Sequence, residues 1–552
     1  MNISIYCTNT DVYKTYPLGI TLEEIAEDQN IKIESDLLGA MVNNRCKSLD
    51  YTVVKPKTIT FFGYDHPEGR RMYAKSLSFM LWVASLRCFP DHTLSIRNSV
   101  SGGYYCKLDN IDTLPINYHE ILKGEMERLV LEAIPFHRHL YPIEQCSKIL
   151  SKEKLYAKKR LFEEYGNLYA PLNEFNGHHN FFYNHLVPNS SHLKSFDIEL
   201  YSDGFILRLP TKNNHGELEP IKNQQKLFQT IRYHKNWANN LNARNLSQLN
   251  DCKYRNWDRD LIKIAEAFHE KEIARIADKI VQSRDSIKMV LIAGPSSSGK
   301  TTFSKRLGIQ LSVLGCTPKQ ISLDDFFVNR VETPLDEKGE YDFEAFEAID
   351  KAFLNHQLDT LFSGEEITKH RFDFTLGERV KTLEKMKLEA HDILIIEGIH
   401  ALNPQLVSDI EQKHIFKIFI SALTPISLDE HNYIPSTDNR LIRRIVRDSK
   451  FRNYNASETI KRWPSVRNGE EKHIFPYQEE ADIMFNSALI YELSVLKPYL
   501  VYRLQSVKER EPEYAEAKRL LNFISYFRSY NASEIPPTSI LREFLGGSSF
   551  EY

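Results

Sequence analysis

The sequence predicts several domains: an α/β domain with a mostly parallel sheet and crossover helices in the C-terminal half, preceded by domains of the α+β class. The length of 552 residues corresponds to three or four domains of roughly 150 residues each. From about residue 286 onward, four apolar runs alternate with amphipathic helices, a pattern typical of parallel sheets. These runs are KMVLIAG, KQISLDD, DILIIEG and HIFKIFIS. The first run leads into a glycine-rich loop, which indicates a phosphate-binding motif at the edge of the predicted sheet.

Composition excludes several classes of protein. The 42% apolar and 26% charged residues are typical of a soluble chain with buried cores, and the formal charge of −3 gives no overall basic field for nucleic acid. The most apolar stretch, residues 77–86, is shorter than the roughly 20 residues of a membrane span, and the first residues do not resemble a secretion signal. Seven scattered cysteines without a CxxC pair indicate reduced thiols. We therefore expect a cytoplasmic protein with no membrane association.

The N-terminal part of the chain divides into two regions by its pattern. Residues 1–62 predict short alternating strands around one helix. Residues 63–215 combine a helix at 71–89 with strand-like runs at 195–201 and 204–210. Both regions mix helix and strand, which predicts the α+β class.

Two further regions flank the predicted α/β domain, which occupies residues 286–500. Residues 216–285 are polar, with apolar positions near a 3.6-residue period, and predict a helical connector. We expect Trp237 and Trp257 in this connector to be packing anchors. Residues 501–552 predict a helical extension followed by a tail with prolines and glycines.

The strongest motif is GPSSSGKT, residues 294–301, which satisfies G-x-x-x-x-G-K-[ST] between an apolar run and an amphipathic segment. Its glycines let the backbone wrap a phosphate with N–H groups, and the helix N-terminus adds positive potential. We expect Lys300 to bridge the β- and γ-phosphates of ATP and the Thr301 hydroxyl to bind Mg²⁺. The predicted nucleotide-binding residues of the loop are Gly294, Pro295, Ser296, Ser297, Ser298, Gly299, Lys300, Thr301 and Thr302.

Acidic residues follow two other apolar runs. Asp324 and Asp325 lie in ISLDDFF, and Glu397 ends DILIIE. The carboxyl ends of parallel strands meet at the ligand-binding edge of an open α/β sheet. A carboxylate at that edge can accept a hydroxyl proton or hold Mg²⁺, and phosphoryl transfer to an alcohol requires both roles. Glu397 stands at the position where a Walker-B-type acidic residue belongs. The alternative for the aspartates is a solvated pair at the start of a turn.

The segment NRLIRRIVRD carries four arginines within eight residues. At helical spacing they share one face, where like charges are unfavourable unless an anion arrives. A lid that closes over a transferring phosphate would meet that anion. The alternative is a solvated basic helix or an RNA-contacting face. The predicted lid arginines are Arg440, Arg443, Arg444 and Arg447.

Residues 288–490 resemble the uridine kinase/phosphoribulokinase family of P-loop kinases. The matching motifs, in order, are GPSSSGKT, SLDDFF, YDFEAFEAID, RFDFTLGER, IIEGIH, NRLIRRIVRD and EEKHIFPYQEEADIMFNSAL. The resemblance implies that Asp324 is the general base toward a 5′-hydroxyl, that Asp342 contacts ribose hydroxyls and that Arg379 reaches the substrate. It also implies that the four arginines form a lid on the donor phosphates and that Glu397 lies near the metal.

Two positions depart from the family pattern. Phe372 stands where uridine kinases carry a tyrosine, and Gly377 stands where a histidine is expected. In the family those two side chains help to read the pyrimidine. The resemblance therefore implies a ribose hydroxyl as the acceptor and leaves the base open, with Phe372 as a candidate substrate-binding residue.

The first 210 residues resemble the front of threonyl-tRNA synthetase. Residues 1–62 look like its small β-grasp (TGS) module, and the segments GRRMYAKSLSFMLWVASLRCFP and LVPNSSHLKSFDI resemble its editing domain. In that domain an H-x-x-x-H pair and a later cysteine and histidine form the metal and catalytic set. The aligned positions here are Lys75, Phe79, Phe182 and Leu186. We therefore expect a non-catalytic module that binds RNA or an amino acid, regulates the chain, or holds it in a homo-oligomer.

The motifs together predict a kinase that transfers the γ-phosphate of ATP or GTP to a nucleoside hydroxyl with Mg²⁺, as uridine and cytidine kinases do. Two alternatives stay open: a P-loop regulatory or tRNA-binding protein without turnover, and a kinase for a non-nucleoside alcohol such as pantothenate or a sugar phosphate. Asp324 beside a predicted lid favours an enzyme, because a switch needs no base for an alcohol.

Overall fold

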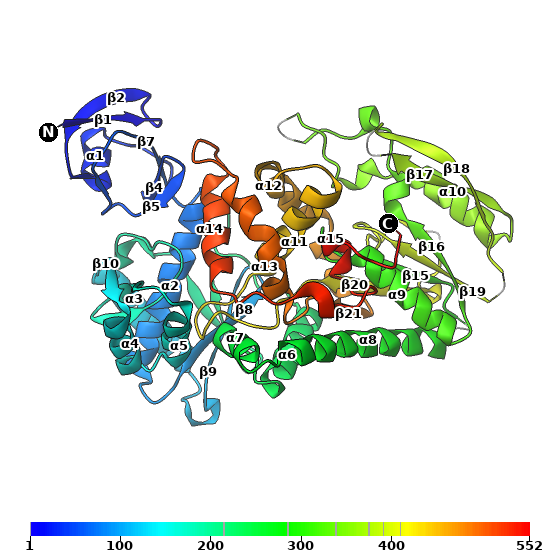
Figure 1. The fold of residues 1–552 in the computed structure, drawn as a ribbon, viewed down its shortest axis with the longest axis horizontal. Coiled ribbons are helices and arrows are strands. Elements are labelled where there is room, and N and C mark those ends of the chain that lie inside the picture. The colour runs from blue at the N-terminus through cyan, green and yellow to red at the C-terminus, as the bar shows by residue number, and fades with distance from the viewer. Residues whose placement is uncertain are drawn as a thin grey trace.

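The computed structural model describes residues 2–212, 216–283, 286–336, 339–373, 376–389, 391–408 and 410–551. Figure 1 shows the N-terminal half on one side and the α/β domain on the other, with helices of the C-terminal extension between them. One hydrophobic core runs from Leu38 in the N-terminal half to Leu545 near the end of the chain. The two halves are therefore packed together and share buried apolar residues.

Residues 2–62 form a small unit with a core of its own. Its elements are β1 (Asn2–Cys7), β2 (Val12–Pro17), β3 (Ile20–Thr21), α1 (Leu22–Asp28), β4 (Gly39–Val42), β5 (Arg45–Lys47), β6 (Thr52–Val53) and β7 (Lys57–Phe62). A mixed sheet has the order β2-β1-β7-β4-β5, with β1 and β7 parallel. Thr21 starts α1 with a capping box that it forms with Glu24. The predicted strands around one helix are confirmed, and the β-grasp (TGS) assignment stays a prediction.

The next region surrounds a long helix, α2, most of which is buried. Its elements are α2 (Pro67–Cys88), β8 (Leu94–Val100), β9 (Gly103–Leu108), α3 (Tyr118–Leu131), β10 (Phe136–Pro142), α4 (Ile143–Lys152), α5 (Tyr156–Tyr165), β11 (Tyr169–Phe175), β12 (His178–Asn180), β13 (Asp197–Tyr201) and β14 (Gly204–Arg208). Two antiparallel sheets have the orders β13-β14-β9-β8 and β10-β11-β12. The predicted helix and both predicted strands of this region are confirmed.

Three helices, α6 (Gln225–Asn240), α7 (Leu246–Tyr254) and α8 (Asp258–Gln282), form the connector that the sequence predicts. The Trp237 ring stacks on Phe268 with centroids 4.3 Å apart, and Trp257 packs against the main core. Both tryptophans are therefore packing anchors, as expected. Helix α8 extends along the lower edge of the molecule in Figure 1 and reaches the α/β domain.

The C-terminal half is built on a parallel sheet with the order β16 (Thr317–Ser322), β19 (Asp392–Glu397), β15 (Met289–Ala293), β20 (Ile415–Ser421) and β21 (Ile483–Asn486). Its helices are α9 (Lys300–Val313), α10 (Lys351–Phe362), α11 (Ser436–Phe451), α12 (Ala456–His473) and α13 (Glu492–Gln505), beside a hairpin of β17 (Ile367–Asp373) and β18 (Glu378–Met386). The four apolar runs form four of these strands, so the predicted fold class is confirmed. The short strand β21, with only four residues, is not among the predicted strands.

The C-terminal extension adds α14 (Tyr514–Ser525) and α15 (Arg542–Leu545). The sequence predicted a tail here, but Ile540, Leu541 and Phe544 are fully buried in the main core. Apolar side chains between the prolines and glycines thus hold the end of the chain in place. Among the described residues, no helix combines the length and the apolar character that a membrane span requires.

Candidate active site

The phosphate loop connects β15 to α9 at the carboxyl edge of the sheet. Position 294 requires glycine, because a Cβ there would lie 2.1 Å from the carbonyl oxygen of Ile420 in the neighbouring strand. Gly299 has a φ of +85° and directly precedes the helix, so the chain turns sharply into α9. The predicted loop residues therefore form one turn at a helix N-terminus, where backbone N–H groups favour an anion.

Lys300 is the first residue of α9 and lies half-buried beside this loop. Its Nζ is 3.5 Å from the Pro295 carbonyl oxygen. Its positive charge lowers the pKa of the nearby carboxyl groups of Glu344 and Glu397, although burial outweighs this effect in both. A phosphate bound by the loop would therefore lie close to the Lys300 ammonium.

Three side-chain oxygens meet at the ends of β16 and β19. Glu397 Oε1 accepts hydrogen bonds from Thr301 Oγ1 at 3.0 Å and from Ser322 Oγ at 3.2 Å. Burial raises the pKa of Glu397 to about 7, although the Lys300 ammonium opposes the shift. Hard oxygen ligands with one carboxylate among them fit Mg²⁺. The structure therefore brings together Thr301 and Glu397, the two residues that the sequence assigned to the metal.

Asp324 and Asp325 follow β16 in a 3-10 turn and differ in their surroundings. Asp324 is exposed, and its negative charge adds to the raised pKa of Glu397. Asp325 points inward, where its Oδ1 accepts a hydrogen bond from the Phe372 N–H at 3.3 Å and burial raises its pKa. Asp324 is thus the member of the pair that lies at the open edge beside the loop.

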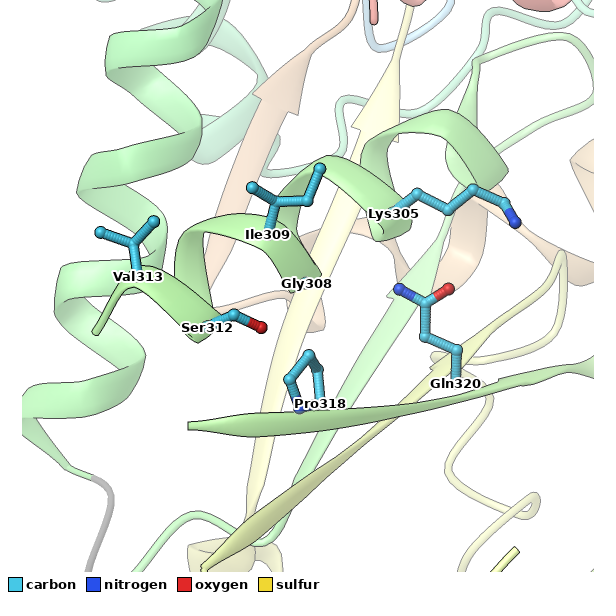
Figure 2. Close-up of a pocket in the computed structure, with 7 residues that line it drawn as sticks. All are labelled: Lys305, Gly308, Ile309, Ser312, Val313, Pro318 and Gln320. Carbon is cyan, nitrogen blue, oxygen red and sulfur yellow. The ribbon is translucent and has the colours of Figure 1, made fainter. Parts of the chain in front are cut away.

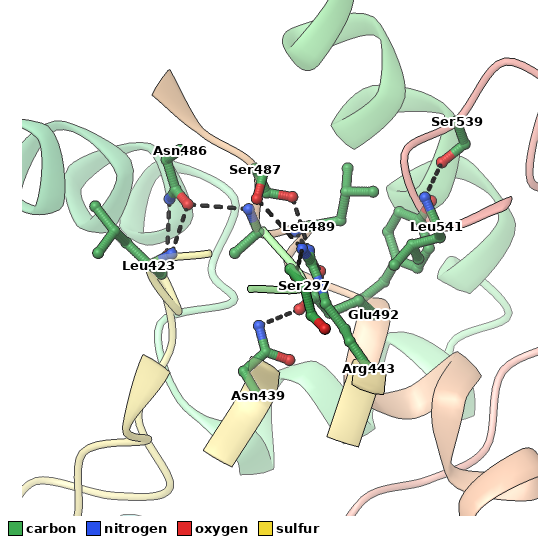
Figure 3. A network of polar contacts seen from close by, with 12 residues as sticks. Ser297, Leu423, Asn439, Arg443, Asn486, Ser487, Leu489, Glu492, Ser539 and Leu541 are labelled. Atoms are coloured by element: carbon green, nitrogen blue, oxygen red, sulfur yellow. Dashed lines mark hydrogen bonds and ion pairs between the residues drawn. The ribbon is translucent and has the colours of Figure 1, made fainter. Parts of the chain in front are cut away.

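Arg443 on α11 is fully buried and holds the loop from behind. It donates hydrogen bonds to the Ser297 carbonyl oxygen at 3.3 Å and to the Ser487 carbonyl oxygen at 2.8 Å, and it pairs with Glu492 at 2.5 Å (Figure 3). Its guanidinium also lies 5.1 Å from the ring centroid of Phe544. These contacts fix the position of the phosphate loop relative to α11 and to the C-terminal segment.

Arg440 is 1% exposed and forms a two-pronged ion pair with Glu470 of α12. It also donates a hydrogen bond to the Ser296 carbonyl oxygen at 3.1 Å, while the Ser296 N–H donates to Glu470 at 3.0 Å. Burial alone would raise the pKa of Glu470, but the charges of Arg440 and Arg467 outweigh it and hold that pKa below its ordinary value. Arg440 and Glu470 thus brace the loop as an ionised pair.

Arg444 and Arg447 are more open, with side chains 14% and 13% exposed. Arg444 donates a hydrogen bond to Ser296 Oγ at 2.8 Å, and both arginines pair with Asp448. Carboxylates therefore relieve the crowding of like charges that the sequence pattern predicted on this helix. The structure brings Arg440, Arg443 and Arg444 to the loop, whereas Arg447 pairs with Asp448 on the same helix.

The candidate acceptor residues are Asp342 and Arg379. Asp342 is half-buried and accepts a hydrogen bond from the Glu344 N–H at 3.1 Å. Arg379 on β18 pairs with Asp350 at 2.7 Å, and its guanidinium lies 4.1 Å from the ring centroid of Phe353. Arg379 is thus held in place by a carboxylate and by a ring before any substrate contact.

The two departures from the family pattern lie on the hairpin. Phe372 is 6% exposed and packs against Phe327, with ring centroids 5.7 Å apart, in the core beneath the hairpin. Gly377 has a φ of +77°, and atoms of the Arg330 side chain come within 2.9 Å of the point where its Cβ would be. Arg330 therefore fills the space that a histidine at this position would need.

Sequence reasoning missed Glu344 and Glu470. Burial raises the pKa of Glu344 to about 7, with the Arg444 guanidinium opposing the shift. Glu470 reaches the loop from α12, 174 residues beyond Ser296. Both glutamates lie within stretches that carry the family resemblance. Their contacts, however, form only where segments that are distant in the sequence meet in the fold.

A shallow hollow of about 540 Å³ lies between α9 and β16, away from the phosphate loop (Figure 2). It is lined by Lys305, Gly308, Ile309, Ser312, Val313, Pro318 and Gln320. None of these is a predicted site residue. In the described part of the chain, no group of three or more His, Cys, Asp and Glu side chains forms a ready metal site.

Residues 289–493 match the model of the phosphoribulokinase/uridine kinase family. The chain is 27% identical over 195 residues to a uridine kinase of Halobacterium salinarum, which covers 35% of this chain and 77% of that protein. It is 28% identical over 194 residues to a uridine kinase of Ligilactobacillus salivarius, which covers 35% of this chain and 82% of that protein.

The N-terminal region matches a different protein. It is 27% identical over 139 residues to the threonine–tRNA ligase of Acetivibrio thermocellus, which covers 25% of this chain and 22% of the ligase. The chain thus spans about a fifth of that ligase. Among solved structures, a possible uridine kinase from Bacillus stearothermophilus is 22% identical with a TM-score of 0.27, covering 39% of this chain and 98% of that one. A D-glycerate 3-kinase from Cryptococcus neoformans is 12% identical with a TM-score of 0.22, covering 46% and 87%.

Proposed function

We propose that the chain, whose residues 289–493 match the model of the phosphoribulokinase/uridine kinase family, transfers the γ-phosphate of ATP or GTP to the 5′-hydroxyl of a nucleoside. The reaction would be of the uridine or cytidine kinase type and would need Mg²⁺. One observation carries this proposal: Lys300, the Thr301–Glu397 pair and the exposed Asp324 converge at one edge of the sheet. A phosphate donor, a metal and an alcohol must meet at such an edge.

On the donor side, Lys300 and the loop N–H groups would hold the β- and γ-phosphates. Thr301 and Glu397 would hold Mg²⁺, which when bound neutralises charge on the transferring phosphate. Arg444 and Arg447, the more open members of the lid set, would contact the donor phosphates. The buried arginines of α11, Arg440 and Arg443, would hold the loop itself.

On the acceptor side, Asp324 would accept the proton of the hydroxyl group as the new P–O bond forms and the bond to the β–γ bridging oxygen breaks. ADP or GDP leaves with that bridging oxygen. Asp342 and Arg379 would position the sugar, and Phe372 would shape the substrate site from the core beneath it. Rate enhancement would come from positioning and charge, as phosphoryl transfer requires.

A second candidate is a kinase for a non-nucleoside alcohol such as pantothenate or a sugar phosphate. The buried Phe372 and the Arg330 side chain at Gly377 favour it, because the two pyrimidine-reading side chains of the family are absent here. Under this alternative the donor side and the role of Asp324 are unchanged.

The test is ADP release from Mg-ATP across a panel of nucleosides, pantothenate and sugar phosphates. We expect turnover with a pyrimidine nucleoside and none with its 5′-deoxy analogue, which lacks the reacting hydroxyl. Turnover with pantothenate or a sugar phosphate alone would select the second candidate. ATP binding without turnover on any member would overturn both and favour a regulatory or tRNA-binding protein.

A further inference from the structure

A loop of the α/β domain lies inside the N-terminal half. We call residues 422–435, which connect β20 to α11, the anchor loop. All of its residues are buried or half-buried. The His431 ring lies 5.6 Å from the ring of Trp82 on α2, and Asn432 Nδ2 donates a hydrogen bond to the Phe181 carbonyl oxygen at 2.9 Å. The anchor loop therefore packs against the central helix of the N-terminal half.

Lys75, one of the four positions that align with the editing residues of the synthetase, contacts the anchor loop. Lys75 Nζ is 3.4 Å from Asn432 Oδ1 and 5.6 Å from the ring centroid of Tyr433. Phe79 and Phe182 pack together with ring centroids 5.5 Å apart. At the aligned positions, Lys75 therefore contacts the chain's own loop and the two phenylalanines contact each other.

A buried ion pair holds the anchor loop. The side chains of Lys158 on α5 and Asp429 are both 0% exposed, and Lys158 Nζ lies 3.2 Å from Asp429 Oδ1. Lys158 also donates to Nδ1 of His431 at 2.7 Å. Burial, together with the Lys158 charge, holds the pKa of His431 well below its ordinary value, so its imidazole is neutral and accepts this hydrogen bond. Removing one partner of such a pair would leave the other charge buried and unpaired.

The anchor loop continues directly into α11, which holds the phosphate loop. Arg440 and Arg443 donate to the carbonyl oxygens of Ser296 and Ser297, and Arg444 donates to the Ser296 hydroxyl. The position of α11 therefore sets the position of the loop that would bind the donor phosphates.

A second set of contacts ties the first turn of α11 to the N-terminal half. Asp438 accepts hydrogen bonds from Arg519 of α14 at 2.7 and 2.8 Å. Arg519 pairs with Glu516 at 2.6 Å, and Glu516 pairs with Arg71 of α2 at 2.8 Å. Two independent lines of contact thus lead from α2 and α5 to α11.

We propose that Lys158 is a positioning residue of the nucleotide site: through Asp429 and the anchor loop, it fixes α11 and the phosphate loop. In this proposal the N-terminal half fixes the position of α11, so that the arginines of this helix reach the phosphate loop of the same chain. This inference rests on the proposed function only in that the loop binds a nucleotide, and it does not depend on the acceptor.

The test uses the full chain and titration calorimetry with Mg-ATP, without an acceptor. Lys158→Met keeps the length of the side chain and removes its charge, and Lys159→Met is the matched control, since Lys159 is 33% exposed and pairs only loosely with Glu163. We expect Lys158→Met to raise the Kd for ATP by about tenfold and Lys159→Met to leave it unchanged. The double variant Lys158→Met/Asp429→Asn should recover part of the loss, because no charge is left unpaired.

A merely structural role would lower the number of binding sites per chain and leave the Kd of the folded fraction unchanged. That result, or a fully folded Lys158→Met with native affinity, would overturn the inference. If Lys158→Met does not fold, Asn432→Ala decides by the same two readouts, because it loosens the anchor loop and keeps both partners of the Lys158–Asp429 ion pair. A chain that binds ATP normally and phosphorylates nothing would refute the proposed function and leave this measurement valid.

Discussion

Lys158 and Lys300 differ in their burial and in their partners. Lys158 in the N-terminal half is fully buried and paired with Asp429 and His431. Lys300 in the α/β domain lies at the edge of the sheet, where within the described residues its Nζ hydrogen-bonds only the Pro295 carbonyl oxygen. A buried cation needs an anionic partner, which Lys158 finds within the chain and Lys300 would find in a ligand. The same residue type therefore supports packing in one region and binding in the other.

The largest predicted effect is on turnover, and it tests whether Lys300 binds the donor phosphates. Lys300→Ala should lower turnover at least about a thousandfold, because the charge that holds the donor phosphates is lost, with little change in the free energy of unfolding. The measurement is steady-state ADP release beside urea unfolding. Lys305→Ala, on the same helix in the hollow of Figure 2, is the control and should retain turnover. Near-native turnover of Lys300→Ala would show that the loop is wrongly assigned.

The next effect concerns stability and compares adjacent glutamates on α12. Glu470 is fully buried against Arg440, whereas the Glu471 side chain is 36% exposed and pairs with Lys212. Glu470→Ala should lower the free energy of unfolding by about 3–5 kcal/mol, because it leaves a buried guanidinium unpaired. Glu471→Ala should cost no more than about 1 kcal/mol. Equal losses in urea unfolding would mean that the buried pair does not brace the loop.

A smaller effect depends on pH. Burial raises the pKa of Glu344 from its ordinary value to about 7, so the folded state holds this proton more tightly than the unfolded chain does. The stability of the native protein should therefore fall as pH rises from about 5 to about 8. Glu344→Gln is neutral throughout, so it should gain stability relative to the native protein across this window. Exposed Glu347→Gln is the control, and thermal unfolding of all three at several pH values gives the answer. Parallel curves for Glu344→Gln and the native protein would contradict the expectation.

Local pattern was enough to predict four of the five strands of the α/β sheet and the phosphate loop. Continuous apolar runs are typical of strands covered on both faces, and a glycine-rich loop before a helix has few other uses. The same reasoning missed Glu470, Arg330 and the buried end of the chain. Each of these depends on segments that are distant in sequence and meet only in the fold, where burial and pairing decide which charges face a ligand. Sequence spacing placed four arginines on one helix, but only the fold separates the buried pair from the open pair.

The smallest predicted effect concerns the contact between the end of the chain and the phosphate loop. Thr302 Oγ1 donates a hydrogen bond to Glu543 Oε2 at 2.7 Å, and the Glu543 charge adds to the raised pKa of Glu397. A triphosphate at the N-terminus of α9 would bring further negative charge to the same place, and like charges disfavour each other.

Glu543→Gln keeps the shape of this side chain and should therefore tighten Mg-ATP binding by about two- to fivefold at low ionic strength, less at high salt. The control is Glu534→Gln in the same extension, where Glu534 lies 3.7 Å from Arg259 and does not touch the loop. Weaker binding of ATP by Glu543→Gln would contradict the expectation that the Glu543 charge repels the triphosphate. Glu543 would then hold the nucleotide, and the C-terminal segment would belong to the binding region of the molecule instead of its packed core.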